Sequence, residues 1–146
     1  MKKMIAAAAL TFVSTLALAQ TSPVGLWKTI DDDGKTEKSL VRITETGGVL
    51  TGTIESVFDA SKQNAKCDQC TDDRKNKPVV GLQIIRGAKQ DADDKAIWTG
   101  GEIVDPNNGK LYKARLKPVD SGKKLEMRGY VGMPMFGRTQ VWLRVE

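Results

Sequence analysis

The only two cysteines of the chain, Cys67 and Cys70, form a C-x-x-C motif. This spacing fits three kinds of chemistry: a disulfide that clips a loop, a redox-active dithiol, and half of a metal site. A redox dithiol favours a helix N-terminus, yet no helical pattern follows, and Asp68 and the pair Asp72-Asp73 oppose thiolate formation. A metal site needs two further ligands, and the chain has no histidine and no second cysteine pair. We therefore favour a structural disulfide, with redox activity as the first alternative.

The absence of histidine excludes Ser-His-Asp and Cys-His nucleophile activation and every His-ligated zinc site. The best candidate for acid–base catalysis by two carboxylates is Glu102 with Asp105, but the two would point to opposite faces of one strand end. The acidic turns that begin at Asp31 and Asp105 resemble cation loops, but an EF-hand starting at Asp31 would place Arg42 where its last acid belongs. We expect no enzyme activity, no metal and no cofactor.

The elements that would position these residues are short stretches of alternating polarity separated by turn residues. No stretch keeps a helical period. The expected strands are 26–30, 39–44, 49–57, 80–86, 96–104, 110–117, 124–131 and 139–145. Eight strands at this spacing predict an all-β fold, either a sandwich or a closed antiparallel barrel.

The N-terminus has the layout of a secretory signal peptide, with Lys2 and Lys3, an apolar run over 5–18 and Ala17-Leu18-Ala19 at its end. An apolar run of about 14 residues is too short to span a bilayer. We predict a signal peptide over 1–19 and one domain over 20–146, exported by a bacterium to the periplasm or beyond, without membrane insertion. The mature chain carries 21 Lys+Arg against 18 Asp+Glu, well mixed, which argues against a nucleic-acid partner.

Four stretches together resemble the DUF2147 family of exported bacterial proteins, which has no assigned function. They are GLW at 25–27, CDQC at 67–70 with KPVVG at 77–81, WTGGEIVDPNNGKLY at 98–112, and RGYVG at 128–132 with GRTQVW at 137–142. The resemblance covers essentially all of the mature chain. It implies a small eight-stranded, lipocalin-like (calycin-type) barrel, in agreement with the strand count.

In a barrel of this kind, the tryptophan of the first strand closes one end beneath an arginine of the last strand. Trp27 with Arg138 or Arg144 is expected to form this closure through a cation–π contact. Gly100-Gly101 and Gly129 lie inside expected strands, where they predict bends or bulges.

Trp98 and Glu102 are four residues apart on one expected strand, so a regular strand would place them on the same face. If that face is interior, Glu102 needs a cation, and Arg86 or Arg128 is the nearest choice. An internal ion pair that fixes the strand register is favoured over a polar anchor for a ligand. These four residues are nevertheless our candidate ligand-binding residues.

The stretch 58–79 has no periodic pattern and is long for a connection in a small domain, so a Cys67–Cys70 clip would shape it into a lid over the barrel. Three functions remain open. The first is a binding protein for a small apolar ligand. The second is an envelope protein with a filled barrel that meets a partner through its surface, and the third is a thiol–disulfide protein.

Overall fold

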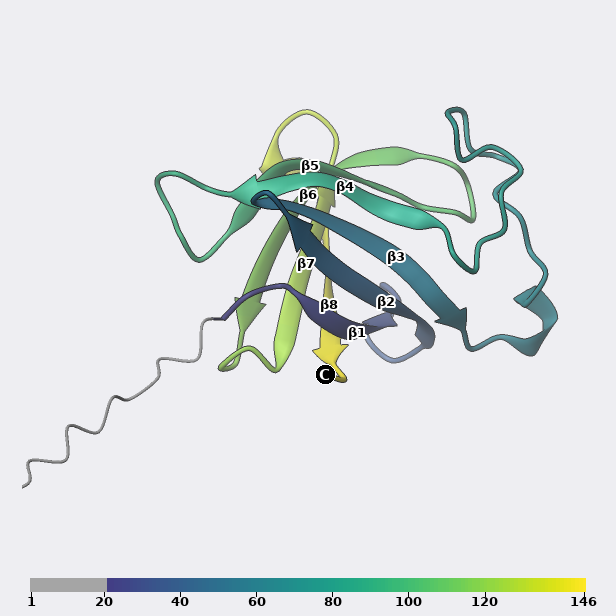
Figure 1. Ribbon diagram of the computed structural model, residues 1–146, viewed down its shortest axis with the longest axis horizontal. Helices are drawn as coiled ribbons and strands as arrows, with labels where there is room; N and C mark the ends of the chain where they lie inside the picture. Colours follow the sequence, from purple (N-terminus) through teal and green to yellow (C-terminus); the bar gives the residue numbers. More distant parts are fainter. Residues whose placement is uncertain (1–20) are drawn as a thin grey trace, which may run out of the picture.

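The computed structural model of the chain describes residues 21–146. The predicted signal peptide and its cleavage site lie outside the described residues. Residues 21–146 form a closed antiparallel barrel in which each strand pairs with its sequence neighbours and β1 also pairs with β8 (Figure 1). The strands are β1 (Gly25–Ile30), β2 (Glu37–Thr46), β3 (Val49–Val57), β4 (Gln83–Gln90), β5 (Trp98–Val104), β6 (Leu111–Val119), β7 (Lys124–Tyr130) and β8 (Arg138–Arg144). The all-β prediction is confirmed, and the barrel is the correct alternative.

Alternating burial along the strands explains why these segments fold as they do. In β2, Ser39, Val41 and Ile43 are buried while the residues between them are more exposed. The same two-residue period places Leu50 and Ile54 of β3 in the interior. Two short 3-10 helices, η1 (Ala60–Lys62) and η2 (Pro134–Phe136), are the described helical elements, and neither has the length and apolar character needed to cross a membrane.

Glycine bulges displace two strands from a regular register. The expected strand 80–86 is shifted to Gln83–Gln90, because Gly87 does not end the strand. It is instead the extra residue between the pairs Leu50↔Ala88 and Thr51↔Arg86, with φ +79°. In β5 the register also shifts between Trp98 and Gly101, as the Gly100-Gly101 pair predicts.

One end of the barrel is closed by the segment that precedes β1. Trp27 is fully buried, and its Nε1 donates a hydrogen bond to the Pro23 carbonyl at 2.7 Å. The Arg144 guanidinium stacks over the Trp27 ring, 4.3 Å from its centroid. Arg144 also donates to the carbonyl oxygens of Ser22 and Gly122. Of the two arginines considered for the closure, Arg144 is the one that covers Trp27.

The other end of the barrel carries the connections that follow the odd-numbered strands: 31–36, 58–82, 105–110 and 131–137. Arg138 lies at this end rather than in the closure, because it begins β8 and bonds Asp32 of the first connection. The long connection 58–82, drawn in teal, extends beyond the ends of the strands in Figure 1. We call this end of the barrel the loop end.

Candidate functional site

A cavity of about 290 Å³ occupies the barrel interior toward the loop end. Much of its wall is apolar and is contributed by strands from around the barrel and by the long connection. The apolar lining consists of Ile54, Val57, Ala65, Val79, Ile84, Ile103, Val104, Met127 and Trp142. The cavity therefore offers a small molecule an apolar surface in the protein interior, next to polar side chains on the same wall.

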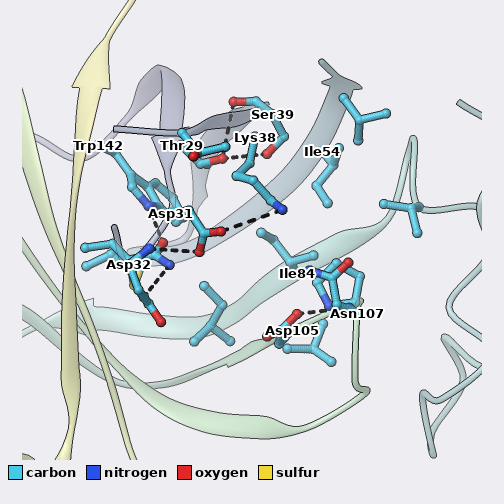
Figure 2. Close-up of a pocket in the computed structure, with 18 of the residues that line it drawn as sticks. Thr29, Asp31, Asp32, Lys38, Ser39, Ile54, Ile84, Asp105, Asn107 and Trp142 are labelled. Carbon is cyan, nitrogen blue, oxygen red and sulfur yellow. Dashed lines mark hydrogen bonds and ion pairs between the residues drawn. The ribbon is translucent and has the colours of Figure 1, made fainter. Parts of the chain in front are cut away.

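Several polar groups on the cavity wall are bonded to one another. Thr29 and Ser39 lie on the adjacent strands β1 and β2, and their hydroxyl oxygens are 2.8 Å apart (Figure 2). The indole Nε1 of Trp142 donates to the Gln140 side-chain oxygen at 2.9 Å. Among residues 21–146, no buried side-chain nitrogen or oxygen lacks a hydrogen-bond partner. These pairings lower the cost of placing polar groups beside an apolar cavity.

The mouth of the cavity is charged. Asp32 accepts from Arg138 Nη1 at 2.5 Å and from Gln140 Nε2 at 2.9 Å, which joins the β1–β2 turn to β8. The Asp31 carboxylate faces Lys38 Nζ at 3.7 Å (Figure 2). A ligand that enters the cavity must pass these charged side chains.

The turn after β5 supplies a further carboxylate to the mouth. Asp105 Oδ1 accepts from the Asn107 backbone N–H at 2.9 Å, and both residues line the cavity (Figure 2). None of the ion pairs found among residues 21–146 includes Asp105. Its side chain thus faces the cavity with no cationic partner.

The connection 58–82 forms part of the cavity wall and is clipped as predicted. Cys67 and Cys70 form a disulfide, and both side chains are almost fully buried. The Cys67 backbone N–H donates to the Lys77 carbonyl and its carbonyl accepts from Asn76, each at 2.8 Å. Ala65 is tied to Val79 in the same way, at 2.9 Å. The disulfide and these backbone hydrogen bonds hold the connection in place along one side of the cavity mouth.

Arg74, which the sequence pattern does not single out, anchors this connection to the barrel. It is 1% exposed, pairs with Asp72 and with Glu102 at 3.2 Å, and donates to the Gln83 carbonyl at 3.1 Å. The side-chain hydrogen bond from Arg74, followed by its backbone N–H, holds the pKa of Asp72 well below its ordinary value. Arg74 lies in a polar stretch without periodicity, so only the tertiary structure reveals its burial.

The expectation that Trp98 and Glu102 share a face is wrong. The β5 bulge places one extra residue between the pairs Trp98↔Leu116 and Gly101↔Ala114. Trp98 is buried in the core, whereas the Glu102 side chain is 42% exposed and pairs with the buried Arg74 of the long connection. A bulge reverses the alternation of faces beyond it, and spacing alone does not reveal this.

The two arginines proposed as partners of Glu102 also lie elsewhere. Arg86 bonds Asp73 at 2.8 Å and thereby lowers the pKa of that carboxyl. Arg128 donates to the Pro134 carbonyl at 2.6 Å and to the Thr139 hydroxyl at 2.7 Å. Neither arginine, nor Trp98 or Glu102, lines the cavity. The four candidate ligand-binding residues are therefore not gathered at this cavity.

Gly129 does line the cavity, although not as a bulge. It pairs in register with Ala114 and Arg138, so no bulge occurs at this position. A Cβ at Gly129 would lie 3.4 Å from the Cβ of Tyr112, which also lines the cavity. Gly129 is thus a position where the lack of a side chain leaves room beside the Tyr112 ring.

The sequence profile of a family described as "Uncharacterized protein conserved in bacteria (DUF2147)" matches residues 25–144. The chain belongs to the DUF2147 family. The match covers all eight strands of the DUF2147 barrel and confirms the resemblance seen in its motifs. Comparison with curated proteins gives no match.

A solved Helicobacter pylori protein, HP1028, is similar to this DUF2147 barrel in structure and is described as belonging to the lipocalin family. The two share 22% sequence identity with a TM-score of 0.72, over 86% of this chain and 84% of the other. At this identity the similarity supports the lipocalin-like fold. Among residues 21–146, no group of three His, Cys, Asp or Glu side chains is suited to a metal ion.

Proposed function

We propose that this protein is an exported binding protein that holds one small, mainly apolar molecule in the barrel. The observation that carries the proposal is the apolar-walled cavity of about 290 Å³ at the loop end. Ligand pockets commonly measure about 300–1,000 Å³, so this cavity suits a small ligand rather than a long lipid. Export is supported by the signal-like N-terminus and by a disulfide, which persists in oxidising compartments.

The size of the cavity also limits the affinity that apolar contacts alone can supply. A ligand that buries roughly 300 Å² of apolar surface gains about 7 kcal/mol before the costs of association. A micromolar dissociation constant corresponds to about 8 kcal/mol. We therefore expect polar contacts at the mouth to contribute to binding.

The direct test is native mass spectrometry of the protein purified from its own host, before and after organic extraction. We expect a bound small molecule that extraction releases and that binds again on addition. A Met127→Trp variant should lose it, because Met127 lines the cavity. Met135→Trp is the matched control, since Met135 is exposed outside the lining.

Two results together would refute this function. One is the absence of any extractable ligand, and the other is no binding below about 100 µM, or roughly 5 kcal/mol, across a panel of small apolar molecules. Binding can be followed through the fluorescence of Trp142, whose side chain lines the cavity.

A surface-interaction function is the second candidate, and one feature favours it. The β7–β8 connection exposes four large apolar side chains: Val131, Met133, Met135 and Phe136. Exposed apolar clusters commonly mark contact surfaces. Replacement of Met133, Met135 and Phe136 by serine should abolish a partner complex in the envelope while leaving ligand binding intact, if this function is correct.

The thiol–disulfide alternative has less support. Thiol exchange requires access to a sulfur atom, whereas Cys67 and Cys70 are 0% and 1% exposed. A reduction potential typical of catalytic oxidoreductases, together with turnover of a disulfide substrate, would favour it.

A further inference from the structure

We propose that the cavity selects ligands with a cationic head group, such as a small apolar amine, and that Asp105 is the residue that receives the cation. This inference rests on the proposed binding function. It concerns which end group the mouth accepts, while the apolar wall accepts the body of the ligand.

The first argument is the balance of charge around the cavity. Its lining includes five acids: Asp31, Asp32, Glu37, Asp59 and Asp105. Against them stand three cations, Lys38, Lys62 and Arg138, which leaves the lining with an excess of negative charge. The described part of the chain has the opposite balance, with 21 basic and 18 acidic residues. The mouth is thus an acidic region on a basic protein, and such a field favours the approach of cations.

The second argument is that two of the three lining cations already have acidic partners, while Lys62 of η1 is the exception. Arg138 is bonded to Asp32, and Lys38 faces Asp31. Glu37 is also paired, through a bond to Lys28 from outside the lining, at 3.0 Å. A carboxylate ligand would therefore have to displace an existing partner at Arg138 or Lys38. A cationic ligand would instead meet an acid that has none.

Among residues 21–146, two lining acids, Asp59 and Asp105, are in no ion pair. Asp59 caps η1, where its Oδ1 accepts from the Ser61 N–H and hydroxyl, and Lys62 of η1 offsets its charge. The acid left for a ligand is Asp105. It is only partly exposed, and its Oδ1 is occupied by the Asn107 backbone N–H. Oδ2 forms no hydrogen bond and no ion pair with any described residue. An ammonium group at Oδ2 would form a charge-assisted hydrogen bond without disturbing the turn.

An aromatic ring on the same hairpin supplies a second feature that suits a cation. Tyr112 lines the cavity and pairs with Ile103, two residues before Asp105. The Arg138 guanidinium already lies over this ring, 5.9 Å from its centroid. The ring therefore accepts a positive charge from the protein itself, and cations favour aromatic faces. A carboxylate and an aromatic ring from one hairpin, both lining a cavity with an apolar wall, match an amine on a small hydrocarbon body.

The test uses three probes of equal length that differ only in the end group: hexylamine, hexanol and hexanoate at neutral pH. We expect hexylamine to bind about tenfold more tightly than hexanol, with hexanoate weakest, because one ion pair at a partly exposed site is worth roughly one power of ten. The advantage of the amine should shrink as salt is added.

Asp105→Asn is the decisive variant, because the amide oxygen still accepts from Asn107 and preserves the turn. It should remove most of the preference for the amine and leave hexanol binding unchanged. Asp91→Asn is the matched control: Asp91 also accepts backbone N–H bonds in a turn, but lies outside the lining. Thermal melting of both variants checks that they fold.

The outcomes separate this inference from the proposed function. Equal binding of the three probes, or preference for hexanoate, would overturn the inference and leave the binding function standing. An amine preference that survives Asp105→Asn would show that another group receives the cation, which also overturns it. If none of the three probes binds the wild-type protein, the result would count against the binding function itself.

Discussion

Loss of the Arg144 side chain should destabilise the barrel more than loss of any exposed arginine. Its guanidinium donates to three backbone carbonyls, those of Ser22 at 2.6 Å, Val24 at 2.8 Å and Gly122 at 2.5 Å. It also covers the face of Trp27. Each bond contributes roughly 0.5–1 kcal/mol and the cation–π contact about 1 kcal/mol, so Arg144→Ala should cost about 3 kcal/mol.

For a domain of this size, a loss of about 3 kcal/mol lowers the melting temperature by roughly 10 °C. Equilibrium unfolding in urea and thermal circular dichroism measure the two quantities. Arg138→Ala is the matched control from the other end of the same strand. The Arg138 side chain is 63% exposed in its pair with Asp32, and exposed ion pairs contribute about 0–1 kcal/mol. Equal effects of the two substitutions would refute the assignment of the closure to Arg144.

Three further predictions follow from the described contacts. Protein from an oxidising compartment should have no free thiol, and replacing Cys67 and Cys70 by serine should cost about 2 kcal/mol while leaving the fold intact, as measured by thiol titration and urea unfolding. The Thr36 hydroxyl, which bonds Asp33, lowers the pKa of that carboxyl from 3.8 to about 2. The ionised Asp33 carboxylate therefore stabilises the fold above pH 3.8, and this stabilisation is lost as the pH falls toward 2. Asp33→Asn should flatten this part of the curve of unfolding free energy against pH. Gly129→Ala should weaken ligand binding, because the new Cβ enters the cavity 3.4 Å from Tyr112, without loss of thermal stability.

The barrel could be predicted from the sequence because its determinants are local. Alternation of apolar residues is clear in several strands, and the turn residues between the stretches mark out all eight. The closure by Trp27 is also predictable, although only the structure distinguishes Arg144 from Arg138. The C-x-x-C disulfide follows from spacing and the expected compartment.

The cavity could not be predicted, because its residues are brought together by register. The β5 bulge turns Glu102 away from the face of Trp98, and this shift depends on how β5 pairs with β6 rather than on β5 alone. The burial of Arg74 depends on carbonyl and carboxylate partners on other strands. The sequence shows Asp105 in an acidic turn three residues after Glu102, but its free oxygen becomes informative only beside the cavity.

The pairing of β1 with β8 constrains the order in which the barrel can assemble. During synthesis, which starts at the N-terminus, the hairpins from β1–β2 to β6–β7 can form between neighbouring segments. The pairing that closes the ring instead joins residues more than a hundred positions apart, such as Trp27 and Arg144. Contacts of such long range form slowly and only after both segments are available. Until β8 arrives, Trp27 lacks its arginine and β1 has an open edge. The finished barrel is thus delayed until β8, the last strand, has been synthesised, and β1 can pair on both sides only from then on.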